Sequence, residues 1–205
     1  MNKWLLGLLA FCLAQAAFAG NYILTVDGKT YEIDIGEQKT VQSAKGNINV
    51  SLEKKATGIF TIDGIAFEHP SSMNPTVSVL SEEIKQVLLA QANGDLFLVQ
   101  LYKGMDGSAL IPLLEKEMTK EEVGVGYAKT GKDIEVKLDN GETLSGRYIH
   151  TEKNTDSYDR YIVGCPIATG GLVAVIQNSD LQTEGQDKDL MMKVLKSLKM
   201  HCTKE

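Results

Sequence analysis

The sequence predicts an α+β fold, in which an antiparallel β-sheet of six or more strands packs with two helices and follows a β-rich N-terminal portion. Short runs rich in β-branched residues recur along the chain, separated by Gly, Asn and Asp. Beyond residue 19, apolar residues recur at helical spacing in two segments, about 108–122 and 187–200. Because the strands come in runs and the helices are few, the strands should pair antiparallel.

The first 19 residues are expected to be a signal peptide, not part of the fold. Lys3 supplies a short basic start, residues 4–13 form an apolar run, and residues 17–19 (AFA) form a small-residue cleavage pattern. The apolar run is too short to span a bilayer, which requires about 18 or more residues. Cleavage after Ala19 would leave a periplasmic or secreted protein without a membrane span.

Removal of this segment changes the composition in two ways. The chain shortens from 205 to 186 residues, and its formal charge moves from −6 to −7 because Lys3 is the only charged residue lost. Cys12 is also lost, which leaves Cys165 and Cys202. A chain of this length can bury its own core, so residues 20–205 are expected to form a single exported domain. Its acidic balance argues against nucleic-acid binding.

The N-terminal portion, residues 20–64, is predicted to consist of short strands. Residues 22–26 and 29–35 flank Asp27-Gly28, a pair that favours a tight hairpin turn. Further strands are predicted at 48–52 and 58–62.

The remaining portion, residues 65–205, carries both predicted helices. Ser108 can cap the first of them, and Pro112 lies in its first turn, where the missing N–H costs little. Before that helix, strands are predicted at 65–68, 76–80, 83–91 and 96–102. Between the helices they are predicted at 133–138, 143–151, 158–165 and 172–177.

Two short segments carry a resemblance to a known family. Residues 67–72 (FEHPSS) follow a predicted strand, and residues 194–198 (VLKSL) lie in the last predicted helix. With the order of strands and helices between them, residues 65–200 resemble the PsbP-like superfamily, which includes PsbP, the Mog family and DcrB-like bacterial envelope proteins. The resemblance implies an α/β/α-like sandwich with no shared catalytic machinery, whose members tend to be binding or assembly factors.

The two remaining cysteines form an even pair. Cys165 lies late in a predicted strand and Cys202 just beyond the last predicted helix. In an oxidising compartment such a pair predicts a disulfide that would hold the end of the helix to the strand. The alternative is a soft-metal site formed by both cysteines with His201 and another histidine.

A second candidate site is a ligand cluster of His150, Glu152, Asp156 and Asp159. His150 and Glu152 share one strand face because alternate residues point the same way. Asp156 and Asp159 are expected in the loop that follows, residues 152–159. The cluster could serve a metal or a proton transfer, or it could be a polar strand end beside a solvated acidic loop. We predict neither a resident metal nor a cofactor.

The sequence favours a periplasmic, non-enzymatic binding or assembly factor that acts through protein–protein contact. One alternative is a small metal-dependent or hydrolytic enzyme that uses His150, Glu152 and Asp159. Another is a periplasmic immunity or inhibitor protein. The partner and the oligomeric state stay open at this point.

Overall fold

A computed structural model describes residues 22–179 and 189–203, and the expected signal peptide lies outside them. The chain divides into two compact units with a boundary between Lys54 and Lys55, which differs from the expected single domain. The boundary also lies earlier than the end of the N-terminal portion at residue 64. Residues 57–70 belong to the second unit because Ile65 and Phe67 are buried in its core.

The first unit consists of two β-hairpins. Its strands are β1 (Tyr22–Val26), β2 (Lys29–Ile33), β3 (Gln38–Ser43) and β4 (Gly46–Ser51). The predicted Asp27-Gly28 turn is confirmed, and both residues have positive φ, at 48° and 79°. Ile33 and Val41 are buried. The Tyr31 hydroxyl donates a hydrogen bond to the Gln42 carbonyl at 3.1 Å, which joins the two hairpins.

The second unit contains the remaining strands and both helices. It begins with β5 (Thr57–Ile62), β6 (Ile65–Pro70), β7 (Thr76–Val79), β8 (Ile84–Ala90) and β9 (Leu96–Lys103). A 3₁₀ turn, η1 (Gly107–Leu110), leads into α1 (Ile111–Gly124). Then come β10 (Ala128–Lys137), β11 (Thr143–Lys153), β12 (Asp156–Ile167), β13 (Gly170–Ser179) and α2 (Leu190–Lys196).

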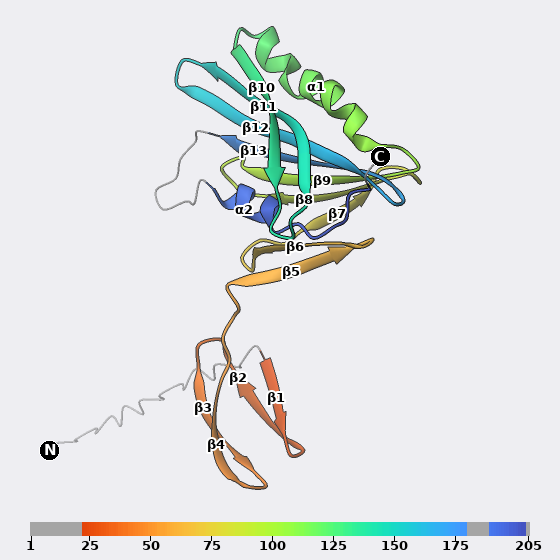
Figure 1. Ribbon diagram of the computed structural model, residues 1–205. Helices are drawn as coiled ribbons and strands as arrows, with labels where there is room; N and C mark the ends of the chain where they lie inside the picture. The colour runs from red at the N-terminus through yellow and green to blue at the C-terminus, as the bar shows by residue number, and fades with distance from the viewer. Residues whose placement is uncertain (1–21, 180–188, 204–205) are drawn as a thin grey trace, which may run out of the picture. The chain divides into compact units, whose positions relative to one another are not determined.

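Seven of these strands form one antiparallel sheet in the order β10-β11-β12-β13-β9-β8-β7. The prediction of an α+β fold with an antiparallel sheet and two helices is therefore confirmed. Helix α1 packs on one face of the sheet, whereas α2 and the β5–β6 hairpin pack on the other (Figure 1). We call these the α1 face and the α2 face.

The helix boundaries differ from the predicted ones for local reasons. Asp106, not Ser108, caps the start, because its side chain accepts a hydrogen bond from the Ser108 N–H at 2.9 Å. The last helix ends at Lys196 instead of residue 200. There Lys199 forms a β-bridge with Ala66, and its N–H donates to the Ala66 carbonyl at 2.7 Å. Residues 187–188 of the predicted helix lie outside the described residues.

Candidate functional site

A disulfide joins Cys165 of β12 to Cys202, with 5.8 Å between their Cα atoms. This confirms the predicted pair. The bond holds the chain that follows α2 against β12, and the Thr203 N–H donates to the Pro166 carbonyl at 2.9 Å beside it. Since both sulfurs are used in the bond, the alternative soft-metal site is contradicted.

The predicted loop at 152–159 is instead a tight hairpin between β11 and β12. Strand β11 runs to Lys153 and β12 begins at Asp156, so only two residues turn the chain. Asn154 adopts a positive φ of 57°, which this short turn requires. Asp159 therefore lies in a strand, directly opposite His150.

Three of the four residues of the predicted ligand cluster come together on the α2 face. His150 Nδ1 lies 2.8 Å from Asp159 Oδ1, and His150 Nε2 lies 3.5 Å from Glu152 Oε2. The Tyr148 hydroxyl donates to the same Asp159 oxygen at 2.6 Å. Asp156 is not part of this group, because its carboxylate accepts from the Tyr127 hydroxyl at 3.4 Å.

The hydrogen bonds to Asp159 influence both of its partners. The bond to the Asp159 carboxylate raises the pKa of His150, burial acts against this, and Glu152 adds to the rise. Burial and the same carboxylate raise the pKa of the Tyr148 phenol above its ordinary value. Protonation of His150 is thus favoured, and Tyr148 stays a donor.

This geometry favours an ion pair at a strand end over a metal or catalytic site. The two ring nitrogens of His150 face different carboxylates, so His150, Asp159 and Glu152 do not converge on one point. Within the described part of the chain, no group of three or more His, Cys, Asp or Glu side chains could hold a metal ion. A His–Asp pair can orient a general base, but its outer nitrogen then faces a nucleophile, and here Glu152 occupies that position.

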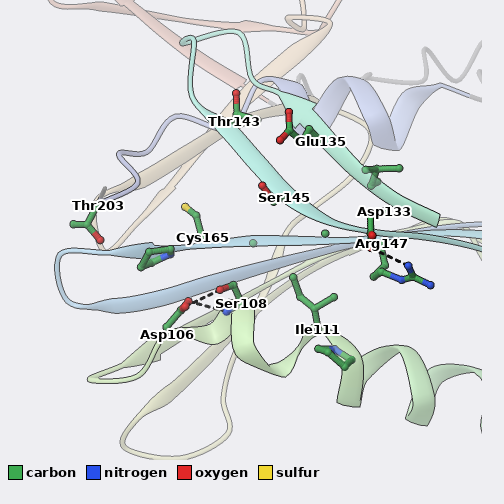
Figure 2. A pocket seen from close by; sticks show the side chains of 15 residues that line it. Asp106, Ser108, Ile111, Asp133, Glu135, Thr143, Ser145, Arg147, Cys165 and Thr203 are labelled. Carbon is green, nitrogen blue, oxygen red and sulfur yellow. Dashed lines mark hydrogen bonds and ion pairs between the residues drawn. The ribbon is translucent and has the colours of Figure 1, made fainter. Parts of the chain in front are cut away.

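A larger feature is an open cleft of about 1070 Å³ on the α1 face, beside the first residues of α1. Figure 2 shows Asp106, Ser108 and Ile111 on the side of the helix. The strands contribute the other side, and Thr203 closes one end. The strand residues that line the cleft are Asp133, Ile134, Glu135, Thr143, Ser145, Gly146, Arg147, Gly164, Cys165 and Pro166.

At the cleft, strands β10 and β11 diverge from the start of α1 (Figure 2). A Cβ on Gly146 would lie 2.0 Å from the Ile162 carbonyl oxygen, and one on Gly164 would lie 2.4 Å from that of Leu172. Only glycine permits such a close approach of neighbouring strands. Beyond the cleft, the β10–β11 turn meets α2, where the Asp139 N–H donates to the Lys196 carbonyl at 2.9 Å. The strands therefore leave α1 uncovered at its start.

The cleft has a negative balance of charge. Among residues 22–179 and 189–203, its lining includes the carboxylates of Asp106, Asp133 and Glu135 and one cation, Arg147. That guanidinium is already bonded to Glu115 at 3.0 Å and to Asp133 at 2.8 Å. The Asp106 carboxylate accepts from the Ser108 hydroxyl at 2.7 Å, and Glu135 is exposed.

The lining of the cleft is suited to binding. It offers hydroxyls, carboxylates and the apolar surfaces of Ile111, Pro112 and Pro166, but no histidine lines it. The group opposite Ser145 is the exposed carboxylate of Glu135, and the lining residues of the described chain supply no histidine-based nucleophile pair. Apart from Cys165, the cleft residues were not predicted from the sequence as a site. The only signal was that 129–133 is polar on both strand faces, whereas a strand at a buried position has one apolar face.

Comparison with known proteins does not assign a function to this cleft. No protein-family model matches the chain, and no curated protein matches it. Among residues 22–179 and 189–203, no helix is both long and apolar enough to cross a membrane.

Proposed function

We propose that this protein is an exported, non-enzymatic binding or assembly factor of the periplasm, and that it binds a segment of a protein partner in the α1-face cleft. One observation carries the proposal: the cleft is open, negatively charged and rich in hydrogen-bonding groups, yet no histidine lies beside its hydroxyls. Its volume of about 1070 Å³ is at the upper limit of ordinary small-molecule pockets, about 300–1,000 Å³.

The charge of the cleft indicates which segment would fit. Asp133 and Glu135 are exposed, so each can accept hydrogen bonds from a cationic side chain. Ser145 and Thr143 lie beside them on β11 and could bond the backbone of an extended chain. A partner segment with Lys or Arg next to small polar residues would therefore complement the cleft.

Two further features support this role. The first 19 residues have the composition of a signal peptide, which would place the protein in the periplasm. A sheet with helices on opposite faces is the architecture that the resemblance of residues 65–200 to the PsbP-like superfamily implies. We propose membership of that superfamily on this basis, because its members tend to bind or assemble other proteins.

Site-specific photo-cross-linking tests the proposal. A photoreactive amino acid at Ser145, inside the cleft, should give a discrete cross-linked protein in cells that express the full chain. The same amino acid at Glu121, on the exposed side of α1, is the matched control and should give none. Equal products from both positions would contradict a role for the cleft.

Charge reversal separates the cleft from general surface charge. Glu135→Lys should strongly reduce the cross-linked product, whereas Glu117→Lys makes the same change of net charge on an exposed part of α1 and should leave it intact. Specific substrate turnover that Glu135→Lys abolishes would favour an enzyme.

Stoichiometric zinc or copper that is lost in His150→Ala would favour the metal-dependent alternative. A toxin as the captured protein, inhibited by binding, would favour the immunity alternative.

A further inference from the structure

The two edge strands of the seven-stranded sheet differ in charge. Strand β10 carries Lys129, Lys132, Asp133, Glu135 and Lys137. Strand β7 carries no charged residue, and none occurs anywhere from residue 71 to residue 81. Charged side chains on an edge strand hinder the addition of another strand. Strand β7 therefore lacks the protection that β10 has.

The exposed side chains of β7 are aliphatic. Within the described residues β7 pairs with β8 alone, and all four of its residues are exposed. Val77 and Val79 are 42% and 67% exposed, and the following Leu80 is 55% exposed. Val77 lies opposite Val87, which is fully buried in the core of the α2 face. Val77 thus continues that apolar core to the open edge of the sheet, and Val79, on the same face, lies opposite Lys85.

The backbone of β7 also has groups directed outward. The Leu80 N–H donates to the Ile84 carbonyl of β8 at 2.9 Å. In an antiparallel ladder, residues with backbone groups that point toward one neighbour alternate with residues that point the other way. Ser78 therefore points toward β8, like Leu80. The N–H and C=O groups of Val77 and Val79 point to the free edge, where a further strand could bond them.

We propose that β7 pairs antiparallel with β7 of a second copy of this chain, about a two-fold axis at Ser78. Val77 of one copy then lies opposite Val79 of the other. Because both residues direct their backbone groups outward, each such pair exchanges two hydrogen bonds. Ser78 lies opposite itself at a position without backbone bonds between the copies.

The order of residues in β7 selects a second copy as the occupant. The segment 76–79 (TVSV) places a valine on each side of Ser78, so the strand is complementary to itself when its direction is reversed. A two-fold interface requires such self-complementarity. No like charges meet, the side chain at the axis is small, and four valines form one continuous cross-strand cluster.

Cysteine cross-linking tests the arrangement directly. In protein expressed from the full 205-residue sequence, Ser78→Cys places two thiols opposite each other, with Cα atoms about 4.5 Å apart. That separation suits a disulfide. We expect a covalent dimer on mild oxidation. Thr130→Cys, in the middle of the other edge strand, is the control and should stay monomeric. Equal or slower cross-linking of Ser78→Cys than of Thr130→Cys would overturn the proposal.

Self-association in solution gives an independent measurement. Sedimentation of the wild-type chain should show a concentration-dependent dimer. Ser78→Lys brings two ammonium groups together at the axis and should weaken the dimer several-fold, whereas Thr130→Lys should not. Ser78 is exposed, so at protein concentrations at which wild type is monomeric, the thermal unfolding temperature of both variants should remain that of wild type. A wild-type chain that stays monomeric throughout, or a dimer that is insensitive to Ser78→Lys, would overturn the proposal.

Discussion

The two faces of the seven-stranded sheet hold their helices by different means. On the α2 face, α2 and the β5–β6 hairpin pack against a large core that consists of apolar side chains. On the α1 face the apolar cluster is smaller, and it contains Ile111, Ile149, Ile162, Val173, Val175 and Tyr102. Beside it, ion pairs link α1 to the strands.

The main ion pair of the α1 face joins Glu122 of α1 to Arg160 of β12. Arg160 is only 3% exposed, and its Nη1 donates to Glu122 Oε2 at 2.9 Å. The Thr151 hydroxyl donates to the same carboxylate at 2.6 Å, and Arg160 Nε donates to Gln177 at 2.8 Å. The position of α1 therefore depends on directional side-chain bonds together with a small apolar cluster, whereas that of α2 depends mainly on buried apolar area. We therefore expect loss of a charge to destabilise the α1 face most, and loss of apolar volume to destabilise the α2 face most.

The largest loss of stability is expected from a substitution in the apolar core of the α2 face. Phe97 is fully buried, and its ring meets Phe67 edge-on with 5.1 Å between the centroids. Phe97→Ala should lower the free energy of unfolding by about 4 kcal/mol, since it removes buried area and leaves a cavity. Urea unfolding measures the loss. Ile59→Ala removes an exposed side chain of β5 and should change the value by no more than about 0.5 kcal/mol.

Loss of the disulfide should lower the free energy of unfolding almost as much as Phe97→Ala. The bond between Cys165 and Cys202 spans 37 residues, and closing a loop of that length is worth about 3–4 kcal/mol in the chain-entropy model. The double variant Cys165→Ala, Cys202→Ala should unfold at correspondingly lower urea concentration. Reduced wild-type protein should match it. A reductant that leaves the unfolding curve of wild type unchanged would show that the bond does not stabilise the fold.

Breaking the ion pair tests the α1 face. Glu122→Gln keeps the size of the side chain but leaves the buried Arg160 without its counter-charge, so stability should fall by about 3 kcal/mol. Glu121→Gln changes an exposed neighbour and should have little effect. The double variant Glu122→Met, Arg160→Met should recover most of the loss, because an apolar pair leaves no uncompensated charge. Without that recovery, the charges themselves would not explain the loss.

The same pair should make the α1 face sensitive to acid. Burial acts to raise the pKa of Glu122, but hydrogen bonds from Arg160 and Thr151 outweigh it, and the pKa is lowered in the folded protein. Its contribution to stability is therefore full above the usual pKa of Glu, about 4.3, and is lost as pH falls through the folded value. Glu122→Gln should remove this part of the pH profile.

The smallest expected effect belongs to His150. Its pKa is raised in the folded state, first of all by Asp159, so the pair stabilises fully below the usual pKa of His, about 6.5. The stabilisation is lost as pH rises through the folded value. Because the pair is partly exposed, we expect a change of less than about 1 kcal/mol. Titration of the His150 ring by NMR should show the raised pKa, and Asp159→Asn should lower it.

Turn residues and the alternation of apolar residues predicted most of the strands. Strands without a clear alternation were not predicted. Hairpin turns such as Asp27-Gly28 have strong residue preferences, so both flanking strands could be placed. Strand β3 was missed because Val41 is the only apolar residue in Gln38–Ser43, and one residue defines no alternation. Asp159 was placed in a loop, since the sequence of 152–159 does not reveal that a two-residue turn brings it opposite His150.

The sequence by itself determined the α+β class, the number of helices and the cysteine pair. Each follows from local periodicity or from composition, which any chain carries before it folds. Tertiary structure alone decided that Glu122 meets Arg160, that Gly146 and Gly164 line a cleft beside α1, and that uncharged β7 lies at an edge. The physical reason is that alternation shows which residues share a strand face, but not which strands are neighbours or which helix covers them.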